Sequence, residues 1–145
     1  MRFVYRCAFV SAALLFACGA TAATTLPVTG LGQSWPNATD VSASPYYHVY
    51  LFERGGVRYV QINDAAGTVL GAIALGGGDV LDLPIGVDAD HWTSAPAGTT
   101  AVAGEPVYRD DEVAISVDPQ ADGTARLTVV PGECTDPSKC SVRGN

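Results

Sequence analysis

From Tyr46 onward, short runs of apolar, aromatic and β-branched residues alternate with clusters of Gly, Asp, Asn and Pro. Within many of these runs apolar and polar residues alternate one by one, which is the period of a strand with one buried face. No window in residues 23–145 carries the apolar stripe of an amphipathic helix. The pattern therefore predicts strands over 46–53, 57–63, 68–75, 79–85, 106–109, 112–118 and 124–130.

The pair Gly55-Gly56 predicts a tight hairpin turn between the first two strands, because such turns need residues at positive φ. Placing Arg54 opposite Val57 puts Glu53 across from Arg58, an opposite-charge pair near the tip. The same register sorts the remaining pairs by face, with Leu51–Val60 and Val49–Ile62 on one face and Phe52–Tyr59, Tyr50–Gln61 and His48–Asn63 on the other. A slip by one residue would scramble both faces, so the pattern favours this register.

A second hairpin is predicted around the turn residues 119–123. With Asp118 opposite Thr124, the apolar face pairs Val117–Ala125, Ile115–Leu127 and Val113–Val129, and the polar face pairs Ser116–Arg126 and Ala114–Thr128. The apolar faces of the two hairpins predict a shared core of Val49, Leu51, Val60, Ile62, Val113, Ile115, Val117, Leu127 and Val129. The acidic residues 110–112 before this hairpin predict a solvated turn rather than an acidic site.

Short turns at 64–67 and 76–78 connect neighbouring strands, which predicts a small antiparallel meander. The expected fold class is all-β, with about six to seven short strands closing as a sandwich or open barrel. This β-domain spans 46–131 and includes a low-complexity, flexible loop over 94–105. An extended arm over 23–45, rich in Thr, Ser, Pro and Gly, precedes it, and a tail over 132–145 follows it.

The N-terminus predicts export. Arg2 and Arg6 precede an apolar run over 7–17, and small residues follow it, which together indicate a signal peptide over 1–22 cleaved after Ala22. The apolar run is shorter than the about 20 residues that a membrane span needs. An alternative is a lipid anchor at Cys18, because residues 15–18 approximate a lipobox, but Phe16 stands where a small residue is expected. The predicted location is the bacterial periplasm or the medium.

Charge and cysteine content agree with an exported, compact domain. Without the leader, Lys plus Arg falls from 8 to 6 while all 15 acidic residues remain, which gives a net charge of −9. Such a surface disfavours nucleic acid and anionic membranes as partners. Cys134 and Cys140 are then the remaining cysteines, and in an oxidising compartment a close pair predicts a disulfide that closes the tail.

Few residues suggest chemistry. Asp88, Asp90 and His91 place carboxylates beside a histidine, which would suit a hydrolase, but no sequence context supplies a nucleophile. The stretch 76–90 resembles one fragment of a glycine-aspartate calcium repeat, but its register is not met and it occurs once. We therefore predict a protein that is not an enzyme and has no catalytic residue, metal site or cofactor.

Aromatic side chains with polar tips alternate on the second face of the first hairpin, beside two amides. Such residues suit recognition, because they offer a large contact area together with hydrogen bonds. The candidate binding residues are Tyr46, His48, Tyr50, Phe52, Tyr59, Gln61 and Asn63. The alternative is that the 23–45 arm or the other hairpin covers this face and makes it part of the core.

The segment 48–64 resembles the central part of small exported proteins of Gram-negative bacteria that carry no assigned function. The resemblance implies an exported location, and it supplies no catalytic residues. Three functions remain open: an exported, non-catalytic module that binds a protein or small ligand, a small secreted inhibitor or envelope accessory factor, and the hydrolase. A rigid protruding hairpin loop would favour the inhibitor, and a cleft holding His91 beside two carboxylates would favour the hydrolase.

Overall fold

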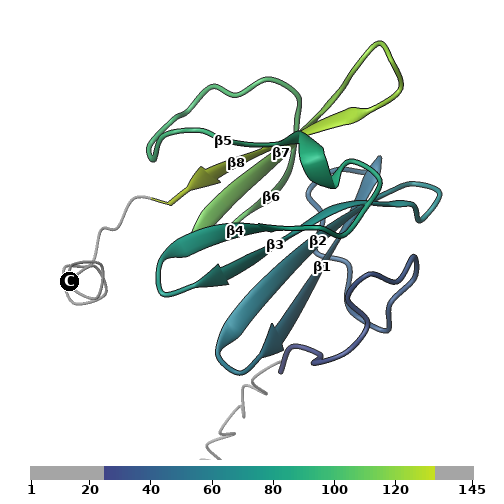
Figure 1. Ribbon diagram of the computed structural model, residues 1–145, viewed down its shortest axis with the longest axis vertical. Coiled ribbons are helices and arrows are strands. Elements are labelled where there is room, and N and C mark those ends of the chain that lie inside the picture. The colour runs from purple at the N-terminus through teal and green to yellow at the C-terminus, as the bar shows by residue number, and fades with distance from the viewer. Residues whose placement is uncertain (1–24, 133–145) are drawn as a thin grey trace, which may run out of the picture.

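The computed structural model describes residues 25–132, which fold into eight strands in two four-stranded sheets (Figure 1). The first sheet has the order β1 (Tyr47–Arg54), β2 (Val57–Asp64), β3 (Val69–Gly76), β4 (Asp79–Leu83). The second has the order β5 (Trp92–Ser94), β8 (Ala125–Pro131), β7 (Val113–Pro119), β6 (Glu105–Arg109). The all-β prediction is confirmed, and because the two sheets stay separate the fold is a sandwich. The predicted signal peptide, Cys18 and the Cys134–Cys140 disulfide lie outside the described residues.

The first hairpin has the predicted register. Tyr50 lies opposite Gln61, Leu51 opposite Val60, and Glu53 opposite Arg58. Both turn glycines adopt positive φ, 60° at Gly55 and 78° at Gly56, as a tight turn between twisted strands requires. The alternation of side chains along β1 and β2 therefore predicted correctly which face of the hairpin points toward the core.

The register predicted for the second hairpin is wrong by two residues. Val117 lies opposite Leu127 instead of Ala125, and Pro119 stays in its strand opposite Ala125. The cause is a shorter turn than expected: the N–H of Gln120 donates to the carbonyl of Thr124 at 2.8 Å, so only three residues remain to reverse the chain. A shift by an even number leaves every side chain on its predicted face.

The connection between the sheets also differs from the prediction. The strand expected over 79–85 ends at Leu83, and residues 92–94 form an unpredicted short strand that pairs in parallel with β8. Between them, Gly86 adopts a φ of 110° and brings its backbone against Leu70, where a Cβ would lie 2.7 Å from the nitrogen of Gly71. A single turn of 3-10 helix, η1 (Ala89–His91), then carries the chain to the second sheet.

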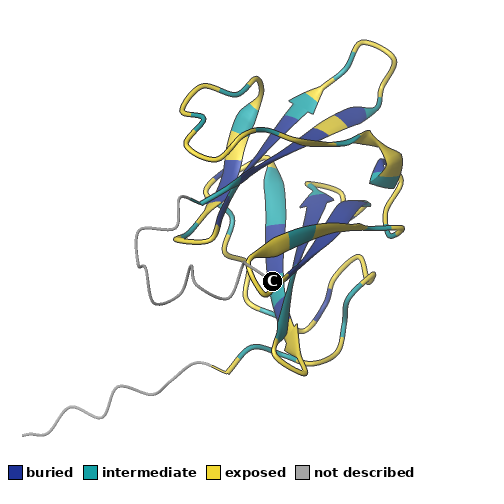
Figure 2. Cartoon of the chain, turned by 60° about the vertical axis from the view of Figure 1, so that its left-hand side comes forward, coloured by how far each residue is buried: buried dark blue, intermediate teal, exposed yellow. Residues whose placement is uncertain are grey.

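The core lies between the sheets, as predicted. Eight of the nine predicted core residues are buried, and Leu51 is partly buried against the cluster. β3 and β6 add further members: Leu70, Ile73, Leu75, Val107 and Tyr108. The buried stretches in Figure 2 follow the strands that face one another, while most turns are exposed and the edge strands β4 and β5 carry no buried residue.

The N-terminal arm, defined here as residues 25–45, packs against the outer face of the first sheet and closes one side of the sandwich (Figure 1). Its Val41 N–H donates to the carbonyl of Val49 at the edge of β1, and its Ala43 N–H donates to the carbonyl of Val107 in β6. The arm thus joins the edge strands of both sheets. On the opposite side, no backbone hydrogen bond between described residues links β4 to β5, and we call this the open side.

Candidate functional site

The arm covers most of the aromatic face that the sequence singled out. Gln61 and Asn63 are completely buried, and Tyr50 and Phe52 are nearly so. Tyr46 remains 65% exposed, while His48 and Tyr59 are half-buried. The structure thus leaves three of the seven candidate residues accessible to a partner, and it makes the other four part of the arm's packing surface.

Two buried amides fasten the arm to this face. The amide nitrogen of Gln61 donates to the carbonyl of Gln33 at 2.8 Å, and its oxygen accepts from the N–H of Gly32 at 2.6 Å. The amide nitrogen of Asn63 donates to the carbonyl of Ser34 at 2.7 Å. These bonds give two completely buried amide side chains the hydrogen-bond partners that burial requires, so the two amides serve as structural attachments.

A carboxylate–histidine pair holds the end of the arm. His48 Nδ1 lies 2.7 Å from Asp40 Oδ2, and the other Asp40 oxygen accepts from the N–H groups of Val49 and Ser42. Burial by itself raises the pKa of Asp40, but the hydrogen bonds from His48, Val49 and Ser42 outweigh it and leave the pKa below its ordinary value. The ring of Trp35 meets His48 edge-on, with centroids 5.2 Å apart.

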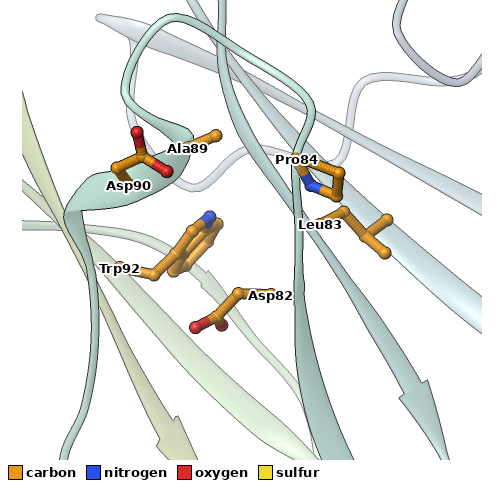
Figure 3. A pocket seen from close by; sticks show the side chains of 6 residues that line it. All are labelled: Asp82, Leu83, Pro84, Ala89, Asp90 and Trp92. Atoms are coloured by element: carbon orange, nitrogen blue, oxygen red, sulfur yellow. The ribbon is translucent and has the colours of Figure 1, made fainter.

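The open side, which the arm does not cover, carries two adjoining hollows. The first, of about 300 Å³, lies between the end of β4 and the segment that leads into β5 (Figure 3). Trp92 stands between its two walls. Its lining residues are Asp82, Leu83, Pro84, Ala89, Asp90 and Trp92.

The second hollow, of about 340 Å³, shares Asp90 and Trp92 with the first and extends to the β7–β8 turn. Its further lining residues are His91, Thr93, Gln120, Asp122, Thr124 and Arg126. His91 Nδ1 lies 3.3 Å from Asp88 Oδ1, and Asp88 is buried while His91 is exposed. The hollow therefore places His91 beside Asp90 and Asp122, the arrangement expected to favour a hydrolase. The described residues place no hydroxyl or thiol in hydrogen-bond contact with His91.

The electrostatics of the open side are acidic. No Lys or Arg occurs between Arg58 and Arg109, and this stretch includes all of β3, β4 and β5. Arg58 lies elsewhere, paired at 2.7 Å with Asp110 and with Glu112. Arg126, in the second hollow, lies 3.8 Å from Asp118. In the turn predicted at 110–112, the carboxylates of Asp110 and Glu112 thus bind Arg58 of the other sheet.

The exposed carboxylate of Asp122 marks the rim of the second hollow. Hydrogen bonds from the hydroxyl and N–H of Thr124 lower its pKa below the ordinary value. Asp122 therefore stays charged at any pH near neutrality and adds to the negative potential there. In residues 25–132, no group of three or more His, Cys, Asp or Glu side chains is arranged to hold a metal ion.

Comparison with known proteins gives no match: no family model, no curated protein and no solved structure resembles the chain significantly. In the described range, no helix is long and apolar enough to cross a membrane.

Three residues that line the hollows were not predicted from the sequence as site residues: Trp92, Gln120 and Arg126. The side chains of Trp92 and Arg126 come together only through the parallel pairing of β5 with β8, and no local pattern encodes that pairing.

Proposed function

We propose that this protein is an exported, non-catalytic β-domain that binds a partner through its open side. The observation that carries the proposal is the asymmetry of the sandwich. The arm occupies the edges of β1 and β6, whereas the edges of β4 and β5 carry two adjoining hollows that share Asp90 and Trp92. A half-buried aromatic ring flanked by carboxylates offers both contact area and polar anchors.

Exposed apolar residues on the same side support the proposal. Leu81 on β4 is 63% exposed, and Val87 in the segment that follows is 69% exposed. Protein interfaces combine apolar contact area with polar groups, and these two side chains supply apolar surface on the side that carries the polar hollows. On the aromatic face of the first hairpin, by contrast, four of the seven candidate residues are buried beneath the arm.

The test is affinity capture with the mature chain, residues 23–145, from a bacterial envelope extract and from culture medium. Asp82→Lys together with Asp90→Lys reverses the charge of the first hollow at two exposed positions. Glu53→Lys together with Asp111→Lys makes the same change in net charge at exposed positions outside both hollows. We expect the wild type and the control variant to retain the same partner and the hollow variant to lose it.

Retention of the partner by the hollow variant, with loss on Tyr46→Ala, would place the binding surface on β1 and contradict the proposal. Thermal melting of each variant separates lost binding from lost folding. All four substituted acidic residues are exposed, so their melting temperatures should stay close to that of the wild type.

The Asp88–His91 pair favours a second candidate, a hydrolase. Asp88 would orient the imidazole of His91, which would act as general base toward water in the second hollow. Turnover of an ester or glycoside substrate by the wild type, lost in His91→Asn and kept in Glu53→Lys, would support this candidate over the binding module. Capture of a partner that depends on Asp82 and Asp90, without turnover of any substrate, would support the binding module.

A further inference from the structure

The edge of β4 is available for backbone pairing. β4 ends the first sheet, pairs with β3 on one side, and receives no backbone hydrogen bond from another described strand on the other. An unpaired strand edge presents a row of N–H and C=O groups that another extended chain can use. The corresponding edge of β1 differs, because the arm pairs with it at Val49 and Tyr50.

Acidic side chains keep copies of this protein away from that edge. β4 carries Asp79 and Asp82, and Asp82 lies opposite the fully buried Ile73 and so points to the same face as the core. An inward-pointing charge at an edge strand is a common protection against self-pairing. Because the mature chain has a net charge of −9, a second copy would also be repelled over longer range. A second copy is therefore a poor occupant of the β4 edge.

The same residues select a cationic strand. One row of its side chains would lie beside Leu81, which is exposed on the outer face of β4. The alternate row would lie beside Asp82 and the first hollow, where Asp90 offers a second carboxylate and Trp92 an aromatic ring. Carboxylates and an aromatic face both attract Lys and Arg. No basic side chain of β3, β4 or β5 competes for them.

We propose that β4 binds an extended peptide segment with alternating aliphatic and basic residues, which adds to the first sheet as a fifth strand. Main-chain hydrogen bonds would provide affinity, and the alternation would provide specificity. This inference rests on the proposed function, because it names the partner class for the same open side.

The experiment titrates the mature chain with an eight-residue peptide of alternating Val and Lys, and in parallel with its Val–Glu counterpart. Binding is followed by calorimetry and by hydrogen exchange resolved to β4. We expect the lysine peptide to bind and to slow exchange in Asp79–Leu83, and the glutamate peptide not to bind. Asp82→Lys with Asp90→Lys should weaken the affinity about tenfold, while Glu53→Lys with Asp111→Lys should change it little.

Three results would overturn the inference: equal binding of both peptides, no binding of the lysine peptide, or binding that leaves exchange in β4 unchanged. If capture from extracts depends on Asp82 and Asp90 but the lysine peptide does not bind, the peptide assignment is wrong and the proposed function stands. If neither capture nor peptide binding depends on these residues, both are wrong.

Discussion

Two fully buried amides, Gln61 and Asn63, connect the central strand β2 to a segment of chain that has no strand structure of its own beyond one bridge. Their neighbours on the outer face, Ala72 and Ala74, are small and leave room for the arm. The amides are polar residues at positions where an uncovered sheet would expose them to water. Their burial is therefore a consequence of the arm.

Removing one of these amides should be costly. Asn63→Ala removes the donor to the Ser34 carbonyl and leaves one N–H of the completely buried Gln61 amide without its acceptor, and a buried unsatisfied group costs about 1–3 kcal/mol of unfolding free energy. Asn37→Ala removes an amide of the same size from an exposed position of the arm, and should change stability by less than about 0.5 kcal/mol. Urea unfolding of both variants measures the difference. Equal losses would mean that the arm does not depend on this bond.

Trp92 depends on a glycine across the core. A Cβ on Gly71 would lie 2.8 Å from Trp92 Nε1 and would also collide with Leu127. Gly71→Ala should therefore cost about 1–3 kcal/mol and shift the tryptophan that lines both hollows. Gly76→Ala in the same strand is the control, since its Cβ would meet only Val57 at 3.7 Å. Thermal melting combined with the partner-capture assay should show both losses in Gly71→Ala and neither in Gly76→Ala.

Among the elements, the two hairpins show what the sequence could predict. Alternation along β1 and β2 specified pairing and faces, because each strand has one face that must be buried. In the second hairpin alternation again specified the faces, but the tight turn after Gln120 set the register, and its geometry was not visible in the residue pattern. The three residues of β5 are too few for any periodicity, so that strand could not be predicted.

The candidate site was less predictable than the fold. Aromatic alternation in 46–52 identified a face correctly but could not say what covers it, because burial there comes from contacts of Gln61 and Asn63 with residues about 30 positions earlier. The sequence pointed to Asp90 and His91 as candidate catalytic residues, and both line the second hollow. Their neighbours across it, Gln120 to Arg126, come from the other end of the domain sequence.

The arm should detach from the first sheet at acidic pH. Because the folded-state pKa of Asp40 is lowered, its contribution to stability is present above the ordinary aspartate pKa of about 3.9 and is lost as the pH falls through the lowered value. The indole N–H resonance of Trp35, whose ring contacts His48, should report a transition below pH about 4. Asp40→Asn should abolish that transition. A transition that persists in Asp40→Asn would assign the acid response to another group.

The sandwich has one closed and one open side, and its charged residues are distributed unevenly between them. Arg58 joins the sheets near the β6–β7 turn through Asp110 and Glu112, whereas the described residues that line the first hollow of the open side include Asp82 and Asp90 but no Lys or Arg. Binding at the open side should therefore weaken as salt rises, because part of the attraction is between exposed charges. Partner retention at 50 mM and 500 mM salt tests this, and retention that does not change with salt would contradict it.

The claim that the open side is the binding surface is tested most directly by hydrogen exchange of the mature chain with and without its captured partner. We expect slower exchange in β4, η1 and β5, residues 79–94, with the arm and β1 unchanged. Slower exchange over residues 25–63 with no change in 79–94 would contradict it, and would return the binding surface to the aromatic face of the first hairpin.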